Sequence, residues 1–117
     1  LTEDQRHKQL SQIGGLIDDV PANVPLIFGG DLNAEPEAAE LRPVRERLTS
    51  VYTAVDPVVP LANRLTFSAM EPDRTIDYLF IRQLGIEVEK VEVEQITLSD
   101  HRPVTADLMV HFTKVKW

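Results

Sequence analysis

Residues 24–33 read VPLIFGGDLN, a compact apolar run that passes directly into glycine and polar residues. Val24 to Phe28 has the character of a fully buried strand, because such strands are continuous apolar runs bounded by turn residues. The run delivers Gly29, Gly30 and Asp31 at its C-terminal end. We therefore expect a buried strand here that places polar side chains just beyond the apolar core.

Upstream of this strand the sequence predicts a helix from about Glu3 to Asp19. Thr2 and Gln5 have the spacing of a capping box, and apolar residues recur behind them at helical intervals. Gly14-Gly15 costs about 1 kcal/mol of helix propensity per glycine. The same glycines would let this helix pack closely on a sheet.

Downstream, residues 36–48 are predicted to form two short helices, since Pro36 suits a first helical position and Pro43 forces a break or restart. Residues 49–74 are rich in proline and scattered polar residues, which predicts a long irregular connection. Within it, residues 65–67 (LTF) are a candidate short strand. Long ordered loops of this kind often line functional sites.

Three further strands are predicted over Ile76–Ile81, Val88–Ile96 and Val104–Phe112. The second alternates valine with glutamate and slips register around Lys90. The final residues, 114–117, have the composition of an exposed chain end. Helices and strands together indicate the α/β class, and 117 residues correspond to one domain at most.

Composition narrows the chemistry that this chain can perform. It has no cysteine, so a metal would be held by oxygen or histidine ligands, a set that suits Mg²⁺ or Mn²⁺. The formal charge of −7 disfavours broad contact with duplex DNA and favours small or lipid phosphoesters as substrates. No run approaches the length of a membrane helix, and the polar start is not a signal peptide. Cytoplasmic and secreted locations both stay open.

Asp31 and Asn33 are the first candidate site residues. Two residues of spacing in an extended chain turn both side chains toward the same side. The carboxylate could accept a proton from water or bind a metal, while the amide could hydrogen-bond a phosphate oxygen. The alternative is a simple turn, since Gly, Asp and Asn are all common turn residues.

Asp77 stands in a strongly apolar strand, where a carboxylate is costly to bury unless it is paired. A histidine partner would satisfy it, and Asp77 would in turn orient the imidazole and raise its pKa. His101 is the best candidate for that partner. Pairing with Arg74 or Arg82, or capping of a turn, is the alternative.

Asp100 and His101 are predicted to lie in a loop, because Pro103 disfavours helix before it and Val104 opens a strand. Adjacent side chains diverge, so Asp100 could reach a metal or its water while His101 contacts phosphate. A cationic imidazole would stabilise charge on phosphoryl oxygens. A solvated loop without function is the alternative.

Four motifs occur in order: GGDLNA (29–34), LTF (65–67), RTIDYLF (74–80) and LSDHRPV (98–104). Together they resemble the C-terminal half of the endonuclease/exonuclease/phosphatase superfamily, which includes deoxyribonuclease I, neutral sphingomyelinases and inositol polyphosphate 5-phosphatases. The resemblance extends from about Leu10 to Phe112. It implies one lobe of a four-layered α/β sandwich, with a mixed, largely antiparallel sheet and covering helices.

The resemblance also implies roles for individual residues. Asp31 would orient or deprotonate the attacking water, and Asn33 would contact the phosphate or intermediate. Asp77 would hold His101, which would bind the scissile phosphate and stabilise the transition state. Mg²⁺ or Mn²⁺ would act as Lewis acid at a metal site that draws on Asp31, Asn33 and Asp100.

Family members carry further metal-site and phosphate-binding residues in an N-terminal half, and no counterpart of these precedes Gly29 here. The whole chain, residues 1–117, is therefore interpreted as a single C-terminal lobe. We expect its exposed apolar face to drive self-association or pairing with the missing lobe. The alternative function is a catalytically inactive lobe that binds phosphate or serves in assembly.

Overall fold

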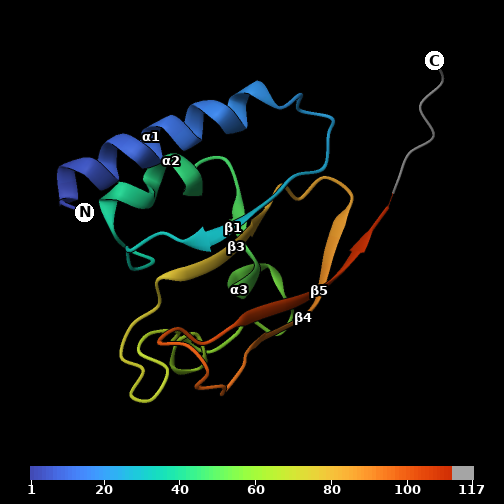
Figure 1. The fold of residues 1–117 in the computed structure, drawn as a ribbon. Helices are drawn as coiled ribbons and strands as arrows, with labels where there is room; N and C mark the ends of the chain where they lie inside the picture. The colour runs from blue at the N-terminus through green and yellow to red at the C-terminus, as the bar shows by residue number, and fades with distance from the viewer. Residues whose placement is uncertain (112–117) are drawn as a thin grey trace.

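The computed structural model describes residues 1–111, so the predicted strand end at Phe112 and the predicted exposed end over 114–117 lie outside the described residues. Figure 1 shows three layers. Helices α1 (Glu3–Asp19) and α2 (Arg42–Arg45) form the first, and strands β1 (Ile27–Asp31) and β3 (Asp77–Ile81) form the middle layer. The third layer is a hairpin of β4 (Ile86–Val93) and β5 (Val104–Val110). This is the predicted α/β architecture, with helices covering one face of an antiparallel sheet.

Helix α1 has the predicted bounds and the predicted capping box. The Thr2 hydroxyl accepts a hydrogen bond from the backbone N–H of Gln5, and the Gln5 side chain accepts one from the N–H of Thr2. Gly14 permits close packing, but against α2 rather than a sheet, because a Cβ there would lie 3.1 Å from Cβ of Pro43. The covering layer therefore consists of two helices in direct contact.

Strands β1, β3 and β2 (Thr49–Ser50) form one antiparallel sheet in the order β1-β3-β2. The expectation of a fully buried strand at Val24–Phe28 is wrong. β1 begins at Ile27 and lies at a sheet edge, where Ile27 stays 52% exposed. β1 begins later in the chain than predicted because the N–H of Val24 bonds to the carbonyl of Pro21 in a turn, and Pro25 has no N–H to donate.

Strands β4 and β5 form a separate antiparallel ladder, with the predicted irregularity of register between Val88 and Lys90. The chain thus has two hydrogen-bonded sheets where one was expected. β4 ends at Val93, before the predicted Ile96: Glu94 still donates its N–H to the carbonyl of Pro103 on the opposite strand, but Pro103 has no N–H to donate and the N–H of Ile96 bonds locally to the carbonyl of Glu94. Only antiparallel pairs occur among the described strands.

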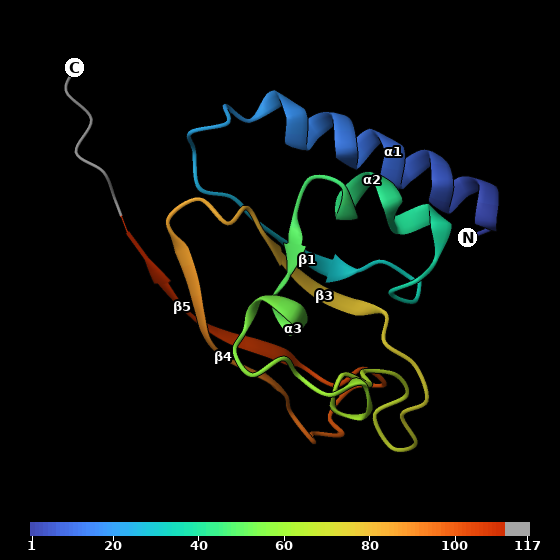
Figure 2. The ribbon, with the colours of Figure 1, turned by 180° about the vertical axis from the view of Figure 1, so that it is seen from behind.

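The two predicted short helices are present as η1 (Ala39–Leu41), a 3₁₀ turn, followed by α2, whose first turn contains Pro43. The expectation that Pro36 begins a helix is wrong, because Pro36 lies in a turn before η1. The connection from 49 to 74 is irregular as predicted, apart from β2, α3 (Val51–Ala54) and η2 (Leu61–Asn63). Residues 65–67 form no strand, and Phe67 makes only isolated bridges, to Arg74 and His101. Figure 2 shows the part of this connection that follows α3 gathered with the 94–103 loop at one end of the β4–β5 hairpin.

Two core clusters lie on opposite sides of β3, since its side chains alternate between faces. Tyr78 and Phe80 pack with α1 and α2 residues such as Leu10 and Leu41. Ile81 joins the other cluster, together with Val51, Ile86 and half-buried residues of β4 and β5. Among residues 1–111, no helix has the length and apolar character needed to cross a membrane.

Candidate active site

Two carboxylates face each other at one end of the β1–β3 ladder. Asp31, the last residue of β1, is in register with Asp77, the first residue of β3, so the two side chains lie on the same face. The Asp77 side chain is 17% exposed and that of Asp31 is 37% exposed. Like charges directly opposite one another destabilise a sheet, so this arrangement favours a cation between them.

His101 provides that group from the loop between β4 and β5. Its Nδ1 lies 2.8 Å from Oδ2 of Asp77, and its Nε2 lies 3.5 Å from Oδ2 of Asp31. The imidazole therefore bridges the two strands. Asp77 pairs with the predicted histidine and not with Arg74 or Arg82, which bond to Asp73 and to backbone carbonyls instead.

The His101 loop is fastened to the irregular segment that contains Phe67. The backbone N–H of Arg102 donates to the carbonyl of Thr66 at 2.7 Å, and Phe67 forms a bridge with His101. The Phe67 and His101 rings are 5.0 Å apart between centroids. The N–H of His101 also donates to Oγ of Ser99 at 3.2 Å. The loop that carries the imidazole is thus fixed through its backbone, and the Phe67 ring packs beside the imidazole.

Thr66 positions Asp77 through the backbone. Its fully buried hydroxyl accepts hydrogen bonds from the N–H groups of Ile76 and Asp77, at 3.2 and 3.3 Å. The hydroxyl of Tyr52 donates to the Asp77 carbonyl at 2.9 Å. From the sequence, Thr66 is expected in a candidate strand and in the LTF motif, with no role of its own. The available signal was a hydroxyl among apolar neighbours, which requires partners when it is buried.

The surroundings of His101 favour its cationic form. The hydrogen bond that His101 donates to Asp77 is the main cause of its raised pKa, and the charges of Asp77, Asp31 and Asp100 act in the same direction. Partial burial opposes them by removing water from the charged ring. The net effect extends the protonated, cationic state of the imidazole to a higher pH than in a free histidine.

A pocket of about 390 Å³ opens over these groups. Asp31, Asp77 and His101 line it together with Arg102, and Leu79 and Val104 supply apolar wall. The arrangement combines a cationic imidazole, a more exposed carboxylate and an arginine within one open cavity. Such a set can bind an anion, orient water beside it and move a proton.

Asn33 does not follow the extended geometry expected for it. Asp31 is the last residue of β1 rather than beyond the strand, and Asn33 has a φ of 50°. Its N–H donates to Oδ1 of Asp31 at 2.9 Å, which makes a tight turn of the kind given as the alternative. Asn33 thereby fixes the Asp31 carboxylate through its backbone. The structure does not bring its side chain into the lining of the pocket.

Asp100 also lies outside the group of three. Its carbonyl accepts a hydrogen bond from the N–H of Ala69 at 2.7 Å, and its Oδ1 accepts one from Oγ of Ser99 at 3.2 Å. The carboxylate is exposed and its charge acts on His101. A metal-site role for Asp100 or Asn33 stays a prediction.

The donors at this site fit a hard divalent cation. Asp31, Asp77 and His101 each offer a ligand atom, and these atoms lie within 4.8 Å of one another. Carboxylate oxygens suit Mg²⁺ or Mn²⁺ better than a soft metal, whereas a cationic His101 has no lone pair to offer a metal. Because Oδ2 of Asp77 is bonded to His101, the more exposed Asp31 is the better ligand.

A second group with suitable ligand atoms is formed by Glu3, His7 and Glu40 on α1 and η1. Here the guanidinium of Arg6 already pairs with Glu40, with Nε and Oε2 3.3 Å apart. The buried carboxylate of Glu40 therefore has its counter-charge within the protein.

The family model described as the Endonuclease/Exonuclease/phosphatase family matches residues 3–101. No curated protein matches the chain. Similar solved structures include a family protein from Bacteroides thetaiotaomicron (18% identity, TM-score 0.79, covering 97% of this chain and 48% of that one). A mannosyl-6-phosphatase from Bacteroides thetaiotaomicron VPI-5482 is also similar, with 19% identity and a TM-score of 0.77, covering 93% of this chain and 47% of that one. A third is a functionally unknown conserved protein from Enterococcus faecalis V583, with 21% identity and a TM-score of 0.76, covering 95% of this chain and 46% of that one. The chain spans about half the length of each.

Proposed function

This chain belongs to the Endonuclease/Exonuclease/phosphatase family, and on that premise we propose that it forms part of a metal-dependent phosphoester hydrolase. Family membership supports a phosphoesterase-type hydrolase in general terms. The observation that carries the proposal is the row Asp31–His101–Asp77, in which one imidazole lies between two carboxylates supplied by adjacent strands. Water is the proposed nucleophile, attacking phosphorus directly.

Each member of the row has a distinct proposed role. His101, whose pKa is raised by Asp77, binds a non-bridging phosphoryl oxygen and stabilises the negative charge that develops there. Asp77 keeps Nδ1 protonated and turns Nε2 toward the pocket. Asp31, the more exposed carboxylate, orients the attacking water and accepts its proton. Asn33 holds Asp31 in place and contacts the phosphate or the intermediate.

Mg²⁺ or Mn²⁺ is the proposed cofactor, held by Asp31 with Asn33 and Asp100 as further metal-site residues. When bound, it supplies Lewis-acid stabilisation of charge on the phosphoryl group. The presence of oxygen donors and the absence of cysteine from the chain support this choice of metal.

The proposed substrate is a small phosphoester or a lipid head group rather than duplex DNA. A formal charge of −7 opposes close approach of a long polyanion, whereas a single phosphate needs only the local cations His101 and Arg102. Similarity to a protein described as a mannosyl-6-phosphatase agrees with a small phosphomonoester, although identity of 19% carries only the fold.

We also propose that the chain is the C-terminal lobe of the family domain and pairs with an N-terminal lobe or with a second copy. In the described residues β1 pairs with β3 alone, so its other edge offers unpaired backbone groups. Val24 and Ile27 are 40% and 52% exposed beside that edge. Sedimentation equilibrium of this chain tests pairing with a second copy, because a monomer at high concentration would contradict it.

Hydrolysis of a generic chromogenic phosphodiester tests the catalytic proposal, with Mg²⁺, Mn²⁺ or chelator present. The assay uses this chain and the full product of its coding sequence. Metal-dependent turnover should fall by about 10²–10⁴-fold in Asp31→Ala and in His101→Ala. Glu87→Ala is the matched control, because Glu87 is an exposed carboxylate on β4 outside the pocket.

Near-normal turnover in both variants would contradict the assigned roles. If the full product shows no turnover with either metal, the alternative of an inactive lobe is favoured. That lobe would recognise phosphate through the same loops or serve in assembly. Turnover by the full product alone would show that the pocket needs residues from a second lobe.

A further inference from the structure

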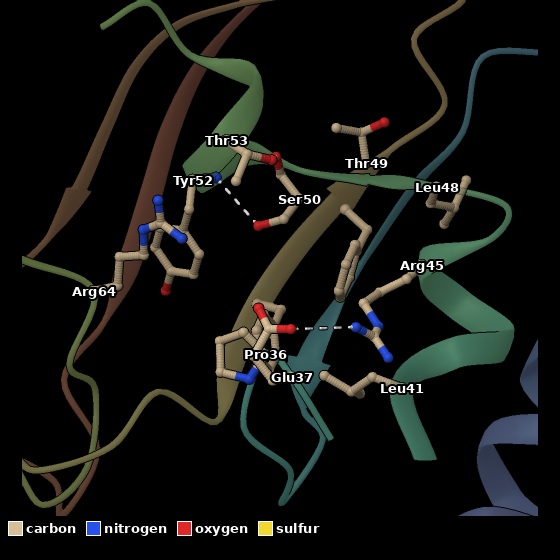
Figure 3. A pocket seen from close by; sticks show the side chains of 12 residues that line it. Pro36, Glu37, Leu41, Arg45, Leu48, Thr49, Ser50, Tyr52, Thr53 and Arg64 are labelled. Atoms are coloured by element: carbon tan, nitrogen blue, oxygen red, sulfur yellow. Dashed lines mark hydrogen bonds and ion pairs between the residues drawn. The ribbon is translucent and has the colours of Figure 1, made fainter. Parts of the chain in front are cut away.

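A second pocket, of about 270 Å³, lies on the opposite side of β3 from His101. Its wall is formed by α2, β2, α3 and the residue that follows η2, and Figure 3 shows these elements around the cavity. Phe80 of β3 lines this pocket alone, Asp77 and Leu79 line only the pocket at His101, and Tyr78 borders both cavities. The two cavities are therefore separated by one strand.

The apolar part of this pocket is well formed. Leu41, Leu48 and Phe80 line it, and each is almost fully buried in the cluster beneath α1 and α2. These side chains belong to the packed core, so the apolar wall exists without a ligand. A wall of aliphatic and aromatic groups suits the apolar body of a small molecule.

Arg64 supplies the polar end. It is only 9% exposed, and its guanidinium carbon lies 5.8 Å from the centroid of the Tyr52 ring. Its Nε donates to the carbonyl of Val59 at 2.7 Å, and among residues 1–111 no carboxylate pairs with it. Among the described residues no buried side-chain nitrogen lacks a hydrogen-bond partner, so the terminal N–H groups of Arg64 reach solvent. They form a fork that matches carboxylate or phosphate oxygens.

The second arginine of the pocket differs from Arg64. Arg45 is on the far side of the cavity in Figure 3, donates to the carbonyl of Ala38, and lies 4.0 Å from the exposed carboxylate of Glu37. Its charge is thus partly matched within the protein. Within residues 1–111, Arg64 has no carboxylate paired with it. The hydroxyl groups of Ser50 and Thr53 line the cavity between the two arginines.

We propose that this pocket binds a small anion with an apolar body, such as an aromatic or aliphatic carboxylate or phosphate. Its charged group pairs with Arg64, and its body lies against Leu41, Leu48 and Phe80. The ligand would lie on the face of β3 opposite to the Asp77 side chain. Tyr52 connects the two places, because it lines this pocket and its hydroxyl donates a hydrogen bond to the Asp77 carbonyl. This site is independent of the phosphoesterase proposal.

The experiment is an NMR titration of the ¹⁵N-labelled chain with 2-naphthoate and, in parallel, with the uncharged 2-naphthamide. Backbone amides of residues 49–53 and 78–80 should shift with naphthoate, with an affinity at least about tenfold above that of naphthamide. Arg64→Gln should remove this advantage. Arg42→Gln is the matched control, because Arg42 is an exposed arginine of α2 outside this pocket.

Because Arg64 packs against Tyr52, its replacement could also weaken the fold. A second variant, Thr53→Phe, fills the cavity from an exposed position of α3 and leaves Arg64 in place. It should weaken naphthoate binding at least about tenfold while the spectrum stays folded. Equal affinity of the two probes, unchanged binding in both variants, or shifts confined to residues 99–103 would overturn the proposal.

Discussion

Strands β1 and β3 come from similar apolar runs, yet they differ sharply in burial. β3 lies in the middle of its sheet with Phe80 and Ile81 at 2% and 1% exposed, whereas β1 lies at the edge with Ile27 at 52%. The contrast extends to their carboxylates, because Asp77 is more buried than Asp31 and makes the shorter contact with His101. One strand provides a fixed support and the other provides an accessible reactive group.

The largest expected effect concerns packing on the two strands. Phe80→Ala should lower the free energy of unfolding by about 3–5 kcal/mol, because it leaves a cavity among Phe28, Tyr78 and the residues of α1 and α2. Ile27→Ala should cost about 1 kcal/mol or less, since half of that side chain already contacts water. Urea denaturation measures both, and equal losses would refute the contrast between centre and edge.

A smaller loss is expected where β3 is held at its start. Thr66→Val keeps the volume of the side chain but removes the acceptor for the N–H groups of Ile76 and Asp77, and should cost about 1–3 kcal/mol. Thr105→Val, on the exposed side of β5, is the control and should change stability by about 0.5 kcal/mol or less. If the two variants are equally stable in urea, Thr66 does not anchor Asp77.

The two carboxylates should also differ in their effect on His101. Asp77→Asn should lower the pKa of the imidazole more than Asp31→Asn, because the Asp77 hydrogen bond is the leading cause of the upward shift and Asp31 acts only through its charge. NMR titration of the His101 ring protons in the native chain, in Asp77→Asn and in Asp31→Asn gives the order of the three pKa values directly. A larger effect of Asp31→Asn would reverse the roles given to the two strands.

The same shift predicts how stability depends on pH. A folded-state pKa above the unfolded value of about 6.5 means that protonated His101 stabilises the fold fully below that pH. This contribution is lost as the pH rises through the folded pKa. Urea denaturation between about pH 5.5 and 8.5 should show the decline in the native chain. Asp77→Asn should flatten it, and an unchanged slope in that variant would contradict the pairing.

The smallest effect is expected at the turn after β1. Asn33 has a φ of 50°, so Asn33→Ala should be less stable than Asn33→Gly by a few tenths to about 1 kcal/mol. Both variants lose the amide side chain, so comparing them by urea denaturation isolates the backbone. Greater stability of the alanine variant would mean that the turn relaxes out of this conformation.

Local signals predicted much of the fold. The capping box and helical periodicity placed α1 correctly, the proline at 43 placed the break before α2, and the valine–glutamate alternation revealed the irregularity in β4. Strand ends were less accurate, as at Val24–Phe28 and Val88–Ile96, because local turn hydrogen bonds, from Val24 to Pro21 and from Ile96 to Glu94, set the boundaries. Those partners are known only once the chain has folded.

The sequence by itself determined the α/β class, helix α1 and the approximate places of β3, β4 and β5, because these follow from local periodicity. The cost of an unpaired carboxylate in an apolar strand showed that Asp77 needs a partner, with His101 favoured over an arginine. Only the tertiary structure decided that β1 is an edge strand, that Asp31 lies opposite Asp77, and that Thr66 and Tyr52 hold the backbone of Asp77. Register and burial depend on which segments meet across long sequence distances, and no local pattern encodes that choice.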